Sequence, residues 1–122
     1  MQRRSQFNLL TGLTLGLVLA LVSGCARKSD VQHQTGELEK AFQSSQTNPY
    51  VRLAVSAVRT NDYAIGAIAL QNAQRLPGLN AAQLMAVQRT MEALTANLVD
   101  RAAKGDANAQ AALAAIERSR SQ

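Results

Sequence analysis

Residues 48–62 read NPYVRLAVSAVRTND and predict a complete helix together with the start of the next one. Asparagine is a favoured N-cap and proline a favoured first helical residue, so Asn48 and Pro49 mark the beginning. Apolar residues then recur at helical spacing and form one face: Val51, Ala54, Val55 and Val58. The helix is expected to end near Thr60, and Asn61 or Asp62 caps its successor.

The same kind of punctuation divides the rest of the chain into helices. The second helix runs to about Leu76 and stops at Pro77-Gly78, and Asn80 caps a long helix over about 81–104. Gly105 ends that helix, and Asp106 caps a last one through about Arg118. The inward faces are predicted as Ala64, Ile65, Ile68 and Ala69; then Leu84, Val87, Met91, Leu94 and Leu98; then Ala109, Leu113 and Ile116. No alternating β-branched run competes, so the sequence predicts an all-α fold, a short helical bundle built on an αα-hairpin.

The stripe on the long helix has the 3-4-3-4 spacing of a heptad seam. It lasts about two heptads, and Arg101 occupies the next seam position. Core packing within the bundle explains the spacing, and a short dimer seam is the alternative.

The first 24 residues have the layout of a secretory signal peptide. Arg3 and Arg4 precede an apolar run of 14 residues over 9–22, and Ser23 and Gly24 are small. A membrane-spanning helix needs about 20 apolar residues, so a permanent single-pass anchor is the weaker interpretation.

Val22-Ser23-Gly24-Cys25 resembles the lipobox of bacterial lipoproteins. The resemblance implies cleavage between Gly24 and Cys25 and a diacylglyceryl group on the Cys25 thiol, with acylation of the new amino group. Two or more acyl chains make a stable membrane anchor where one does not. An ordinary signal peptide with a coincidental cysteine is the alternative. Ala26, in place of an aspartate, resembles lipoproteins sorted to the outer rather than the inner membrane.

The polar stretch 26–36 is aperiodic, which predicts a flexible tether over 25–36 behind the lipid. The small helical domain is then expected over 37–122. It would open on a short helix from Glu37 to about Ser45, with Thr35 as N-cap and Leu38, Ala41 and Phe42 on its inner face.

Composition narrows the classes of function. Without Arg3 and Arg4 the chain has 11 basic and 8 acidic residues, and the basic ones form no cluster typical of nucleic-acid binding. Alanine makes up 21 of the 98 residues from Cys25 onward, and it buries little area, so we expect a domain that packs on a partner or on a second copy.

No constellation typical of catalysis or of a bound cofactor or metal is present in the sequence. His33 is the only histidine and falls in the predicted tether, and there is no glycine-rich phosphate loop or metal-ligand spacing. We therefore expect no enzyme activity.

The segment 50–81 carries a second resemblance. Asn61-Asp62-Tyr63-Ala64 resembles the turn between the two helices of a tetratricopeptide repeat, and Leu76-Pro77-Gly78-Leu79-Asn80 resembles the segment after the second helix. Ala57 and Ala73 stand where that family has small residues. An ordinary αα-hairpin explains the same punctuation.

These observations lead to one functional hypothesis and two rivals. The hypothesis is a lipid-anchored protein of the cell envelope, on the periplasmic face, with a non-catalytic interaction or structural domain. It would dock a protein partner or a second copy through residues such as Tyr50, Tyr63 or Met91. The first rival is a module that binds a small ligand or lipid in a groove between the hairpin and the long helix. The second is a cytoplasmic nucleic-acid or regulatory protein that keeps its first 24 residues.

Overall fold

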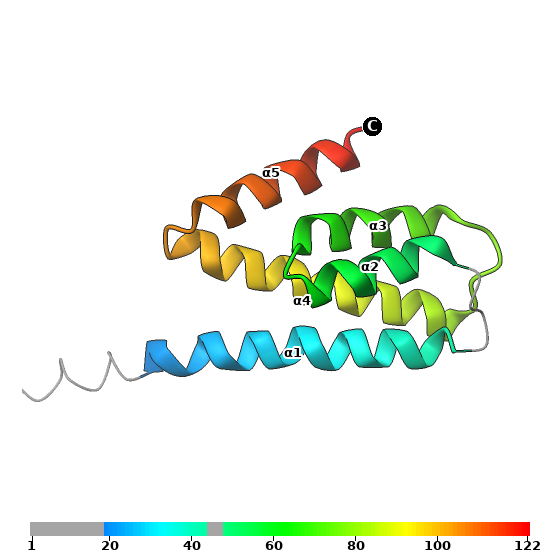
Figure 1. Ribbon diagram of the computed structural model, residues 1–122, viewed down its shortest axis with the longest axis horizontal. Coiled ribbons are helices and arrows are strands. Elements are labelled where there is room, and N and C mark those ends of the chain that lie inside the picture. Colours follow the sequence, from blue (N-terminus) through cyan, green and yellow to red (C-terminus); the bar gives the residue numbers. More distant parts are fainter. Residues whose placement is uncertain (1–18, 44–47) are drawn as a thin grey trace, which may run out of the picture.

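The described residues, 19–43 and 48–122, form five α-helices and no strand (Figure 1). In this computed structural model the helices are α1 (Leu19–Ala41), α2 (Pro49–Arg59), α3 (Tyr63–Arg75), α4 (Ala81–Ala103) and α5 (Ala107–Arg120). For 19–29 the structure describes the backbone alone. The all-α bundle and the αα-hairpin, here α2 and α3, are confirmed.

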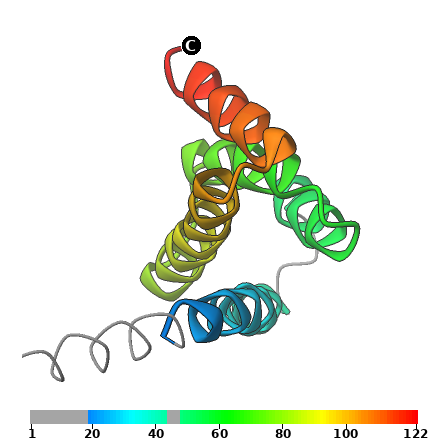
Figure 2. The ribbon, with the colours of Figure 1, turned by 90° about the vertical axis from the view of Figure 1, so that its left-hand side faces the viewer.

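Helix α3 is the centre of the arrangement. It packs between α2 and α4, whose backbones do not approach each other closely within the described residues. Seen end-on in Figure 2, α1 lies on the open side that α2 and α4 leave, and α5 lies on the opposite side. Helix α1 packs closely along α4 and much less on α2, and α5 packs on α3 and α4.

Short polar residues begin four of the five helices, as the sequence predicts. Asn48 accepts hydrogen bonds from the backbone N–H groups of Tyr50 and Val51, with Pro49 as first helical residue. Asp62, rather than Asn61, caps α3. Asn80 and Gln83 form a reciprocal capping box at α4. These side chains satisfy N–H groups that have no partner inside the helix.

The buried faces of α2 and α5 agree with the predictions, whereas those of α3 and α4 are partly shifted. Ile65 is 45% exposed and Leu84 40% exposed, so the prediction that they face inward is wrong. In α3 the core side instead carries mainly small residues, with Gly66, Ala67, Ala69, Leu70 and Ala73 buried. Val87, Leu94 and Leu98 of the predicted α4 stripe are buried, which confirms the interpretation as core packing.

The predicted tether is wrong over 30–36, because these residues belong to α1. Val31 and Leu38 are fully buried and Phe42 is 6% exposed. Thr35 is inside the helix and not at its N-cap, and its hydroxyl donates to the carbonyl oxygen of Val31 at 2.7 Å. Val31, Thr35, Leu38 and Phe42 follow a 4-3-4 spacing, which makes a continuous buried stripe on α1. The stripe is easily missed in the sequence because one of its members is polar.

Two polar side chains of α4 reach the backbone of α1. The amide nitrogen of Gln83 donates to the carbonyl oxygen of Ala41 at 3.3 Å. The hydroxyl proton of Thr90 is shared between the carbonyl oxygen of Gln34, at 3.2 Å, and that of Ala86 in its own helix, at 2.8 Å. Both side chains are buried and seven residues apart, so they fix the antiparallel register of the two helices.

The corner between α4 and α5 depends on one carboxylate. Asp106 caps α5 by accepting from the backbone N–H groups of Asn108 and Ala109, and it accepts from the guanidinium of Arg101 in the last turn of α4. Gly105, with φ of 90°, supplies the left-handed residue that this turn requires. Charged Asp106 therefore links the two helices.

This corner predicts a specific loss of stability in acid. The hydrogen bond from Arg101, followed by that from the Ala109 N–H, holds the pKa of Asp106 below its ordinary value of 3.8. Because the pKa is lower in the folded state, the stabilisation is complete at neutral pH and is lost as the pH falls below about 4. We expect the melting temperature to fall less between neutral pH and about pH 3 in Asp106→Asn, which keeps a good N-cap without the charge, than in the wild type. Equal decreases in the two proteins would contradict this role.

Candidate functional site

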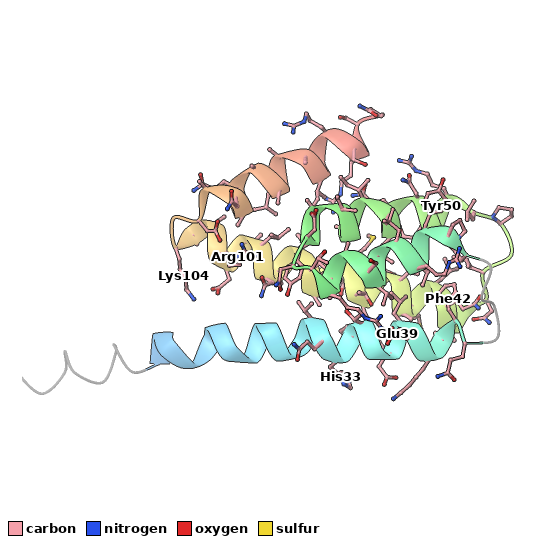
Figure 3. All side chains as sticks on the ribbon, viewed as in Figure 1. His33, Glu39, Phe42, Tyr50, Arg101 and Lys104 are labelled. Atoms are coloured by element: carbon pink, nitrogen blue, oxygen red, sulfur yellow. The ribbon has the colours of Figure 1, made fainter. Side chains whose placement is uncertain are left out.

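A groove of about 540 Å³ lies between the C-terminal part of α1 and helix α2. Its floor is apolar and consists of Phe42, Val51 and Val55, which also belong to the core. The groove exists because α1 packs closely against α4 and leaves space beside α2. Glu39 lies in the C-terminal half of α1, and Phe42 follows directly after the last residue of that helix (Figure 3).

The rim of the groove is charged. Arg52, Ser56 and Arg59 lie along one side of α2, and Glu39 lies opposite on α1. An ion pair of 2.7 Å joins Arg59 Nη2 to Glu39 Oε1 across the groove, and both side chains are well exposed. Helix α2 contains no acidic residue. Apolar floor and basic rim together suit an amphipathic, acidic occupant.

The exposed apolar side chains suggest a second, smaller candidate surface. Leu76, Leu84 and Met85 stand within ten residues of one another around the turn between α3 and α4. This turn lies at the end of the bundle away from the N-terminus of α1 (Figure 1). The other exposed apolar side chains, Leu53, Ile65 and Val99, are on three different helices.

The three residues predicted to contact a partner do not form one surface. Tyr50 and Met91 are half-buried and pack against the core from α2 and α4. Tyr63 is only 6% exposed, so its role is in the core and it is not part of a contact surface. The predicted ligand groove between the hairpin and α4 is also misplaced, because α3 and α4 pack against each other there and the groove lies between α1 and α2.

Gly24 and Cys25 lie within α1, in the part for which the structure describes the backbone alone. The predicted cleavage between these two residues and the lipidation of Cys25 stay predictions. Most of the predicted signal peptide, 1–18, lies outside the described residues. None of the helices in the described part of the chain is long and apolar enough to cross a membrane.

Acid–base and metal chemistry gain no support from the side-chain arrangement. His33 is exposed on α1 and is not among the residues of the groove. Within the part of the chain that the structure describes, no three His, Cys, Asp or Glu side chains are grouped so that they could hold a metal ion. The pKa of Glu37 is lowered by a hydrogen bond from its neighbour Lys40, an exposed ion pair typical of a helix surface.

The groove residues on α1 could not be recognised as a site from the sequence. Glu39 and Arg59 are twenty residues apart and belong to helices whose relative position depends on α4. A sequence signal exists only for α2, where Arg52, Ser56 and Arg59 share one helical face. Comparison of the chain with protein-family models, with curated proteins and with solved structures finds no match.

Proposed function

We propose that this protein is a lipid-anchored component of the bacterial cell envelope whose helical bundle binds another protein and catalyses no reaction. The observation that carries the proposal is the position of Cys25, the only cysteine of the chain, at the end of a lipobox-like segment. Among the side chains that the structure describes, which begin at residue 30, the first fully buried one is Val31, six residues after Cys25. At 1.5 Å per helical residue, this is a spacer of about 9 Å.

A spacer of this length would hold the bundle close to the membrane surface. The partner would then be a membrane neighbour or a protein that reaches the surface. We propose the periplasmic face, with the outer membrane favoured by Ala26. The tetratricopeptide resemblance over 50–81 stays a prediction, and a hairpin of that kind would serve the same interaction role.

Intact-mass analysis of the full protein extracted from membranes tests the anchoring. We expect a chain that begins at Cys25 and carries a diacylglyceryl group, with or without a further acyl chain. Cys25→Ser, which removes the thiol alone, should abolish this lipid-modified species. A mature chain that begins at unmodified Met1, or a soluble cleaved product without lipid, would overturn the proposal.

The groove between α1 and α2 gives a reason to keep one alternative function, the binding of a small ligand or lipid. Its volume of about 540 Å³ falls within the range of small-molecule pockets, and its floor is apolar. Native mass spectrometry of the purified protein separates the two functions. A small molecule that co-purifies and is lost on substitution of Arg52 would favour the alternative.

A further inference from the structure

We propose that the groove between α1 and α2 receives a short, acidic, amphipathic helix of a partner protein. The proposal deepens the interaction role given above and rests on it. It goes further by assigning the groove as the contact surface and by stating the chemistry of the partner.

The shape of the groove favours a helix as occupant. Its lining extends from Asn48, the N-cap of α2, to Arg59 at the end of that helix, twelve residues that span about 16 Å and three helical turns. Apolar floor residues Phe42, Val51 and Val55 occupy the bottom of the groove, while both sides are polar. A helix with one apolar face buries that face in such a groove and leaves the other in solvent.

A small ligand fits this geometry less well. Small-molecule sites usually surround most of the ligand, whereas this groove is partly open to solvent. The hydrocarbon part of a lipid would also gain nothing from the arginines along the rim, and a fatty acid has only one carboxylate for them. The open form and the charged rim together favour a peptide.

The charges at the rim favour carboxylates. The guanidinium of Arg52 has no hydrogen-bond or ion-pair partner among the described residues, and α2 contains no acid. Glu39, the only acid among the described residues that line the groove, is already paired with Arg59. That pair is exposed, so its opening costs little, and an incoming carboxylate can replace Glu39. Arginine binds carboxylates through two parallel hydrogen bonds, which would orient the incoming helix.

The groove is also accessible if the protein is anchored at Cys25. Glu39 lies fourteen residues further along the same helix, about 21 Å along its axis. The groove is thus at the end of α1 away from the proposed lipid.

A binding experiment with synthetic helices tests the proposal. The full-length protein, held in detergent micelles, is titrated against a fluorescein-labelled peptide of fourteen residues with leucine at every third or fourth position and glutamate between. A second peptide with lysine in place of each glutamate is the control probe. We expect the acidic peptide to bind with an affinity that falls as salt is added, and the basic peptide not to bind.

Two charge reversals locate the contact. Arg52→Glu should weaken binding of the acidic peptide at least tenfold, because it replaces an attractive charge at the rim with a repulsive one. Arg89→Glu changes an arginine of α4 that is also exposed but does not line the groove, and it should leave the affinity unchanged. Protection of backbone amides from hydrogen exchange on peptide binding should be confined to α2 and the C-terminal half of α1.

Each other outcome overturns the proposal. These outcomes are equal binding of both peptides, no binding of the acidic one, the same affinity in Arg52→Glu, or protection elsewhere in the bundle. Displacement of the peptide by oleate, with tighter binding of oleate, would assign the groove to a small ligand. Repeating the titration with Cys25→Ser separates this proposal from the proposed lipid anchor. We expect the wild type and the variant to bind the acidic peptide equally, because binding does not depend on a lipid at position 25.

Discussion

Replacement of Leu94 by alanine is expected to lower the free energy of unfolding by about 3 kcal/mol. Leu94 is fully buried in the middle of α4, in the core where α4 meets α3. Its Cδ1 atom lies over Gly66, only 3.3 Å from the position that a Cβ atom there would take. Because both helices approach closely at this point, the removed methyl groups leave a cavity that the rigid helices cannot close.

The matched control is Leu84→Ala, the same chemical change ten residues earlier on the same helix. Leu84 is 40% exposed, so its truncation should cost less than about 1 kcal/mol. Chemical denaturation of the full-length protein, followed by circular dichroism, measures both. The heptad spacing in the sequence predicts equivalent core positions for the two leucines. Equal losses of stability in the two variants would support that equivalence and contradict the expected difference.

The ends of α2 to α5 could be predicted from the sequence, because they depend on local chemistry. Asn48, Asn80 and Asp106 each cap the helix that the sequence assigns to them. The side-chain oxygen satisfies backbone N–H groups two or three residues away, so no information about the rest of the fold is needed. The glycine that ends α4 is predictable for the same reason.

The orientation of α3 could not be predicted from hydrophobicity, because close packing favours small side chains there. Gly66 and Ala67 face the neighbouring helices, while the larger Ile65 is turned to solvent. A periodicity argument gives most weight to isoleucine, whereas the narrow space between α3 and α4 admits glycine and alanine. The burial of Tyr63, predicted as a contact residue, follows from the same dependence on tertiary packing.

The candidate groove was beyond sequence analysis for a further reason. One of its two sides is formed by α1, and half of α1 was predicted to be a tether. The stretch 30–36 contains only one large apolar residue, Val31, and it has a glycine at 36. Its helical form depends on contacts with α4, which supplies the partner surface for Val31 and Thr35. Most of the stability of such helices comes from tertiary packing.

The second large effect expected is the destabilisation of the bundle by a proline in this part of α1. Gln34→Pro removes a backbone N–H from the interior of the helix, and its ring clashes with the carbonyl group of Asp30. It also disturbs the Gln34 carbonyl oxygen that accepts from Thr90. We expect a loss of about 3 kcal/mol in the free energy of unfolding, since the buried stripe cannot follow a kinked helix onto α4.

Gln34→Ala is the matched control, because it shortens the same half-buried side chain and keeps the backbone N–H. Alanine favours the helix, so this variant should be as stable as the wild type within about 0.5 kcal/mol. Denaturant unfolding of both full-length variants measures the difference, and amide hydrogen exchange shows whether α1 has detached while α2 to α5 remain folded. A flexible tether would tolerate either residue at position 34. If the proline and alanine variants had the same stability, the packing of α1 on α4 would therefore be refuted. The groove that α1 forms with α2 would then be refuted as well.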